Sequence, residues 1–205
     1  GGAGAQKEIF ANIIKYLIPY IKKNKAVLYV NVGDYKNVWD ELIRDIPQMR
    51  ELATEHFDNW KDTKAFAAKA LSASQINNSD VVTDNNRDDN SKNITADNSS
   101  EDTSDNITGI HGFYHKNIFE AVYCTNLLMR SADVLVTKPS ELAFYPVPKL
   151  FIKRVGGHEQ WGAVHSAEIG DGTLECRDIP HTLQMIKLFM EDDTYIIDMC
   201  KNIKK

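Results

Sequence analysis

The feature that most constrains the fold is an alternation of short apolar runs with amphipathic segments of helical length. Residues 26–32 (AVLYVNV) form a nearly continuous, β-branched apolar run that ends at Gly33 and Asp34. Such a run is typical of a parallel strand that is covered on both faces. Residues 134–137 and 149–155 repeat this character, and residues 107–114 predict a further strand with its exit loop.

The segments between these runs show the spacing of helices. Residues 7–23 place apolar side chains three and four positions apart, which predicts an amphipathic helix. We expect further helices at residues 35–46, 47–71, 118–130, 159–169, 181–190 and 194–203. Strands that alternate with helices indicate an α/β fold with a Rossmann-like, doubly wound parallel sheet, which binds ligands beyond the carboxyl ends of its strands.

One tract interrupts this pattern. Residues 72–106 are crowded with Asn, Asp and Ser, and eight of the 29 acidic residues but only two of the 24 basic ones lie between Ser72 and Ile110. Such a segment buries too little apolar surface to offset the entropy that ordering costs. We predict a disordered acidic insertion at 72–106, which divides one domain into residues 1–71 and 107–205.

Charge and composition narrow the classes of partner. A formal net charge of -5 argues against a nucleic-acid partner held by phosphate neutralisation. The three cysteines lack the paired spacing of a metal site or a disulfide framework. No apolar run approaches the roughly 20 residues of a membrane span, and the N-terminus lacks a signal pattern. We expect a soluble, cytoplasmic protein that holds neither a metal nor a cofactor.

A glycine-rich segment stands directly before the first helix. The small residues of Gly1-Gly2-Ala3-Gly4-Ala5-Gln6 let backbone N–H groups approach a phosphate, and the helix dipole favours negative charge there. The alternative is a tight turn without a ligand. In a doubly wound sheet the phosphate loop follows a central strand, so we expect the native protein to extend upstream and supply it.

Two later loops also place polar groups after a strand. Thr137 is followed by Lys138, Pro139, Ser140 and Glu141, which offer an ammonium, a hydroxyl and a carboxylate to a ligand. The alternative is that Ser140 caps a helix and Glu141 lies in its first turn. In the second loop, Glu159 and Gln160 follow His158 and could hydrogen-bond sugar hydroxyls. Here the alternative is a solvated first helical turn with a structural histidine.

In this order the motifs resemble the C-terminal, donor-nucleotide-binding domain of GT-B glycosyltransferases. The similar group is the family 28-like one, which includes the bacterial lipid II synthase and the plant galactolipid synthases. The likeness spans most of the chain apart from the insertion and the helix before it. In the family's sugar-facing loop a glycine and a downstream glutamate are usual, whereas Pro139, Ser140 and Glu141 stand here. The similar motifs are residues 1–5 (GGAGA), 132–138 (ADVLVTK), 158–163 (HEQWGA), 170–172 (GDG) and, more loosely, 112–115 (GFYH).

The resemblance implies the binding of a nucleotide-sugar, a UDP-sugar, for hexosyl transfer to an acceptor held by a missing N-terminal domain. The fragment alone would be inactive, and no catalytic residue is assigned. Peripheral membrane association would come through the missing half. By this likeness residues 1–6 face the diphosphate or sugar, Phe113, Tyr114 and His115 border the base, Lys138, Pro139, Ser140 and Glu141 form the donor loop, and His158, Glu159 and Gln160 lie near ribose or sugar.

Two other functions use the same kind of domain, and a third alternative is a Rossmann-like domain that retains no activity. One is a nucleotide-sugar epimerase or hydrolase, which a carboxylate pair in an acceptor domain would favour. The other is a non-catalytic or split subunit, which works only after docking to a second polypeptide. An entire second domain upstream would favour the single-chain transferase, whereas an initiator Met and one strand upstream would favour the split form.

Overall fold

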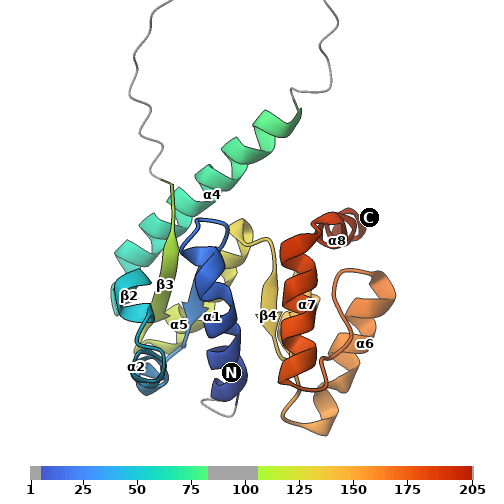
Figure 1. Ribbon diagram of the computed structural model, residues 1–205, viewed down its shortest axis with the longest axis horizontal. Coiled ribbons are helices and arrows are strands. Elements are labelled where there is room, and N and C mark those ends of the chain that lie inside the picture. Colours follow the sequence, from blue (N-terminus) through green and yellow to red (C-terminus); the bar gives the residue numbers. More distant parts are fainter. Residues whose placement is uncertain (1–5, 83–105, 205) are drawn as a thin grey trace, which may run out of the picture.

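The computed structural model describes residues 6–82 and 106–204, with the side chains of residues 76–82 and His158 left aside. The chain is an α/β protein with two parallel sheets and helices packed around them (Figure 1). In chain order the elements are α1 (Lys7–Ile21), β1 (Val27–Asn31), α2 (Lys36–Asp45), α3 (Met49–Leu52), β2 (Ala53–Phe57), α4 (Trp60–Val82), β3 (Gly109–Tyr114), α5 (Ile118–Leu128), the 3-10 helix η2 (Met129–Ser131), β4 (Leu135–Thr137), η3 (Glu141–Phe144), β5 (Lys149–Phe151), η4 (Gly157–Glu159), α6 (Gln160–Ile169), α7 (Ile179–Glu191) and α8 (Thr194–Ile203).

The first sheet has three strands in the order β1-β3-β2, so β3 is central although it comes last in the chain. Both pairings are parallel, with Val27 opposite Gly109 and Phe57 opposite Tyr114. All three strands therefore end at the same edge of the sheet. In Figure 1 this edge lies low in the view, where α2 follows β1.

The second sheet pairs β4 with β5, again in parallel. The segment that follows α6 runs along the outer edge of β5, because Lys149 N–H donates to the Asp171 carbonyl at 3.0 Å and Thr173 N–H donates to the Lys149 carbonyl at 2.9 Å. All three β5 residues are buried as a result. The apolar run at 149–155 thus becomes a shorter strand than expected.

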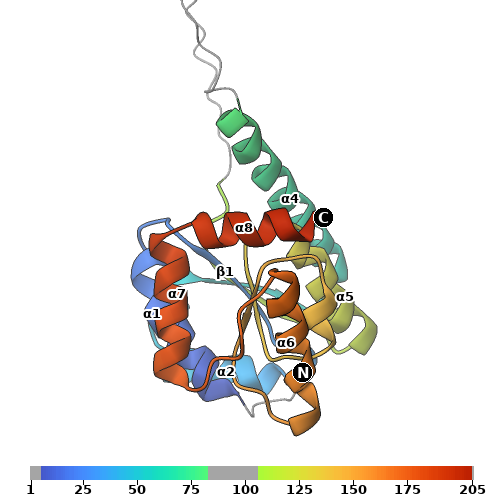
Figure 2. The same cartoon turned by 90° about the vertical axis from the view of Figure 1, so that its right-hand side faces the viewer.

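One hydrophobic core joins the two sheets. The buried face of α1 includes Ile13, Ile14 and Ile21, and it shares this core with α7 and with side chains of β1, β4 and β5. Figures 1 and 2 show α1 and α7 side by side over this region. A second core, made by α4 and α5 with Phe113 of β3, covers the other face of the three-stranded sheet. The expected covering of the strands by helices is therefore present.

The described strands form two sheets because β1 and β4 each pair on one side only among residues 6–82 and 106–204. Four of the five residues of β1 are half-buried, and the fifth, Val27, is 40% exposed. The first two residues of β4 are also half-buried, in contrast to β5. The expected α/β class with parallel strands is therefore confirmed.

The single helix expected at residues 47–71 is wrong. The structure instead has the short helix α3, the strand β2 at Ala53–Phe57 and the start of α4 at Trp60. The β2 sequence (ATEHF) contains one β-branched residue and lies at the sheet edge, with Thr54 and Glu55 exposed and His56 buried. The segment thus lacks the alternation of apolar and polar residues that marks a strand, and helix-favouring neighbours lie on both sides of it.

Helix α4 also extends past its expected end at Leu71 to Val82, which lies inside the segment expected to be disordered. The rest of that expectation concerns residues 83–105, which lie outside the described residues. The other expected helices are present with ends shifted by a few residues; α7, for example, begins at Ile179 rather than at His181.

A tryptophan and a glycine meet at the centre of the first sheet. Trp39 of α2 is fully buried, and its indole N–H donates to Glu55 Oε1 of β2 at 2.9 Å. A Cβ atom added to Gly112 of β3 would lie 2.5 Å from the Trp39 ring. This separation is shorter than any real Cβ contact, so the indole packs there only because residue 112 has no side chain.

Candidate functional site

Three of the segments that the sequence marked lie at the edges where strands end. They are the start of α1, the loop after β4 and the segment after β5 (Figure 1). Ligands of open α/β sheets bind outside the carboxyl ends of the strands. The region where these three segments lie is therefore the candidate site, and we call it the junction.

The start of α1 is fixed against the segment after β5. Gln6 is buried, and its side-chain amide donates to the Lys153 carbonyl. Gln6 is the N-cap residue of this 15-residue helix, and its side chain makes no cap hydrogen bond. The first N–H groups of a helix have no partner within it, so an anion would be stabilised at this position. Gly1, Gly2, Ala3, Gly4 and Ala5 lie outside the described residues.

Lys138 and Glu159 form an ion pair between the loop after β4 and η4. The Lys138 side chain is 19% exposed and that of Glu159 is 8% exposed. The other carboxylate oxygen of Glu159 accepts from the N–H groups of Val155 at 3.1 Å and Gly156 at 3.4 Å. The two loops that the sequence proposed separately are therefore joined through one carboxylate.

The other residues of the loop after β4 serve the packing of η3 against α6. Pro139 is buried, Ser140 is half-buried and Glu141 is exposed. The Ser140 side chain makes no cap hydrogen bond, so the capping role considered for it is wrong, whereas Glu141 does lie in the first turn of η3. Gln160 is exposed at the start of α6, where its amide is free to meet a ligand.

The residues proposed to border a base lie at the carboxyl end of β3. Phe113 and His115 are fully buried, and Tyr114 is half-buried. His115 Nε2 lies 3.1 Å from Thr63 Oγ1, while its Nδ1 has no hydrogen-bond partner within the described part of the chain and lies 3.6 Å from Glu120 Oε2. Burial lowers the pKa of this imidazole below its usual value, although Glu120 opposes the shift. The side chains of Phe113 and His115 thus belong to the core, and any ligand would meet the backbone here.

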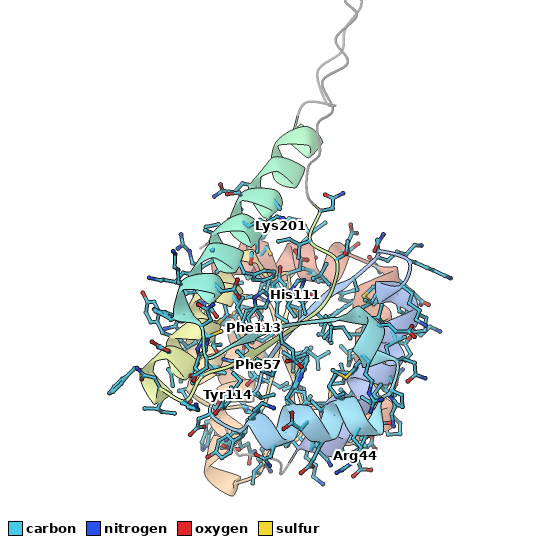
Figure 3. All side chains as sticks on the ribbon, turned by 90° about the vertical axis from the view of Figure 1, so that its left-hand side faces the viewer. Arg44, Phe57, His111, Phe113, Tyr114 and Lys201 are labelled. Carbon is cyan, nitrogen blue, oxygen red and sulfur yellow. The ribbon has the colours of Figure 1, made fainter. Side chains whose placement is uncertain are left out.

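A relay of polar side chains under α4 was missed by the sequence analysis. His56 Nδ1 lies 2.6 Å from Asp62 Oδ2, and His56 Nε2 lies 3.1 Å from His111 Nδ1. Figure 3 shows His111 and Phe113 along β3, beside α4. Burial and the neighbouring His56 lower the pKa of His111 to about 4. The relay became recognisable only once β2 was known to lie beside β3.

A second buried polar cluster lies in the two-stranded sheet. Lys149 of β5 is fully buried, and its ammonium donates to Asp171 Oδ2 at 2.7 Å and to the carbonyls of Tyr145 and Val147. The Ser166 hydroxyl donates to the other oxygen of Asp171. All donors and acceptors of this cluster are paired, so it holds the loop before α7 to the sheet. The G-D-G sequence at 170–172 was its only signal.

An exposed apolar surface adjoins the end of β3. It surrounds a hollow of about 630 Å³, and among the described residues that line this hollow Glu120 alone is charged. Phe119 is 81% exposed there. The lining residues are Trp60, Ile118, Phe119, Glu120, Val122 and Tyr123.

Two features are absent from the described residues. No three histidine, cysteine or acidic side chains within residues 6–82 and 106–204 gather as ligands of a metal ion would. In the same ranges, no helix combines the length and apolar character that crossing a bilayer requires.

Comparison with known proteins gives a family. Residues 1–99 and 73–205 match the model of a family described as Domain of unknown function (DUF6938). The two matched segments cover the whole chain and overlap within the acidic tract. No curated protein and no solved structure matches the chain. The chain therefore belongs to the DUF6938 family.

Proposed function

We propose that the chain binds a nucleotide-activated sugar, a UDP-sugar, as the donor half of a GT-B glycosyltransferase with a Rossmann-like sheet. One observation carries the proposal: the start of α1, Lys138 and Glu159 converge on the edge where β4 and β5 end. This is the edge at which nucleotides bind to folds of this class.

The junction suits the diphosphate of such a ligand. The uncapped start of α1 presents backbone N–H groups after a glycine-rich segment, and Lys138 supplies a positive charge from the neighbouring loop. Oriented N–H groups stabilise the charge that builds up on a departing diphosphate. In the proposed reaction these groups hold the leaving group, and the acceptor comes from outside this chain.

The end of β3 suits the base. His115 N–H donates to the Gly33 carbonyl at 3.0 Å, which ties the ends of β3 and β1 together. The buried side chains of Phe113 and His115 fix the backbone on both sides of Tyr114. A base would then bind against a rigid backbone edge, with the half-buried Tyr114 beside it. Ribose and sugar hydroxyls would meet Gln160, which is exposed at the start of α6.

The test is calorimetric titration of the protein, carrying whatever sequence precedes Gly1 in its gene, with UDP and several UDP-sugars. We expect saturable binding that falls at least about tenfold in Gly4→Asp, because a carboxylate would then meet the diphosphate. Asn12→Asp is the matched control, since it adds the same charge at a half-buried position further along α1. Equal binding by Gly4→Asp and Asn12→Asp, or no binding by any folded form, would refute the proposal.

The product of turnover then separates transfer from the other two reactions. A transferase releases UDP only as the sugar moves to an acceptor, whereas a hydrolase releases UDP and free sugar in water. An epimerase changes the sugar and releases neither. Phosphorus and proton NMR of the reaction mixture distinguish these outcomes.

A further inference from the structure

The Glu159 carboxylate is held as a bound anion would be held. It accepts from the Lys138 ammonium and from the N–H groups of Val155 and Gly156. A lysine together with two consecutive backbone N–H groups is a combination that binds phosphate and carboxylate groups in many proteins. All three donors converge on one side chain that is 8% exposed.

The position of this carboxylate is also where a ligand anion is needed. Val155 and Gly156 follow Lys153, whose carbonyl accepts from Gln6 at the start of α1. The same short segment therefore contacts both the helix N-terminus and Glu159. An anion at the start of α1 would lie next to donors that the protein's own carboxylate already occupies.

We propose that Glu159 occupies an anion site in the ligand-free protein and that a phosphate oxygen of the ligand replaces it on Lys138 and the two N–H groups. The inference rests on the proposed function only in naming that phosphate as part of a nucleotide diphosphate. No covalent bond changes: the three donors exchange one anionic acceptor for another, and the Glu159 side chain turns out to solvent.

The exchange has an energetic consequence. A phosphate and the Glu159 carboxylate cannot both accept from the same donors, and two anions side by side repel each other. The carboxylate therefore competes with the ligand and weakens its apparent affinity. A glutamine at 159 keeps the size of the side chain and an acceptor for the Val155 and Gly156 N–H groups, but it removes the competing charge.

The experiment is calorimetric titration with inorganic pyrophosphate and, separately, with UDP. The proteins compared are the wild type, Glu159→Gln, the double variant Glu159→Gln with Lys138→Met, and Glu191→Gln. Glu191 is the matched control because it also pairs with a lysine, Lys187, but at the far end of α7. Melting curves establish that each variant is folded, and Glu159→Ala replaces Glu159→Gln if that variant fails to fold.

We expect Glu159→Gln to bind pyrophosphate about tenfold more tightly than the wild type, which corresponds to about 1.4 kcal/mol. The double variant loses this gain, and Glu191→Gln binds as the wild type does. If UDP binds the wild type and Glu159→Gln binds it no more tightly, the anion-site inference is wrong while the nucleotide function stands.

A different result would support the anion-site inference and contradict the proposed nucleotide function. Pyrophosphate binding by Glu159→Gln that depends on Lys138, without UDP binding by any form, supports the anion site and removes the nucleotide function. No binding of either compound by any folded variant overturns both.

Discussion

The two sheets bury polar side chains in different ways. In the three-stranded sheet, His56 and His111 lie against each other, and the chain of contacts ends at Asp62, whose side chain is 45% exposed. In the two-stranded sheet, Lys149 and Asp171 form an ion pair that is almost completely enclosed. In the first cluster burial favours the neutral form of His111, whereas the second cluster keeps both of its charges and satisfies each of them. The comparison predicts that mild acid destabilises the protein through the histidine cluster of the three-stranded sheet. It also predicts that removing one partner of the Lys149–Asp171 pair destabilises the two-stranded sheet.

The largest effect is expected for Lys149→Met, which leaves the Asp171 carboxylate buried without its cation. We expect this change to lower the free energy of unfolding by about 3–5 kcal/mol, measured by urea denaturation. Lys201→Met, which breaks an exposed pair with Asp198, should cost less than about 1 kcal/mol.

A double variant sharpens this prediction. Lys149→Met combined with Asp171→Leu should recover much of the lost stability, because no unpaired charge then remains. Equal losses in Lys149→Met and Lys201→Met would mean that the enclosed cluster does not depend on its charges.

The second effect is the response of the three-stranded sheet to pH. His111 has a pKa of about 4 in the folded protein and an ordinary value of 6.5, so the unfolded chain binds a proton more readily between these values. The contribution of neutral His111 to the free energy of unfolding is fully present above pH 6.5. This contribution is lost as the pH falls toward 4, and the loss amounts to about 3 kcal/mol in all.

The measurement is the free energy of unfolding between pH 7 and pH 5, above the range in which most carboxylates titrate. His111→Gln should flatten this dependence, because the group that takes up the proton is gone. His165→Gln, at an exposed position, should leave it unchanged. A slope that survives in His111→Gln would assign the response to His115 or another group.

The smallest effect is expected for Asp62→Asn, which weakens the acceptor at the exposed end of the histidine relay. A cost of about 1 kcal/mol is expected, because one charged hydrogen bond at 2.6 Å becomes neutral while its geometry remains. Asp40→Asn, in the exposed pair with Lys36, provides the baseline. If Asp62→Asn lowers the free energy of unfolding more than Lys149→Met does, the histidine relay contributes more to stability than the Lys149 cluster, contrary to the prediction.

The parts of the fold that follow from apolar periodicity could be predicted from the sequence. The helix after Gln6 and the strand after Lys25 were found because their apolar residues repeat at a regular period. The strand β2 was missed because its residues gain their pairing from β3, which follows more than fifty positions later. Local propensity does not contain that information.

The candidate site could also be predicted only in part from the sequence. That Lys138 and Glu159 lie at strand ends follows from the order of strands and loops, and the structure brings them into contact. The hydrogen bonds that the Val155 and Gly156 N–H groups donate to Glu159 depend on the turn after β5, whose geometry no residue type dictates. The burial of Phe113 and His115 was also beyond the sequence, because it depends on how α4 and α5 cover β3.

The contact between Trp39 and Gly112 has a consequence for sequence variation within the family. The indole fills the space that a side chain at 112 would take, so neither position is free to change alone. Any relative with a larger residue at the position of Gly112 should carry a smaller one at the position of Trp39. The two positions should therefore covary across the family, although more than seventy residues separate them in the chain.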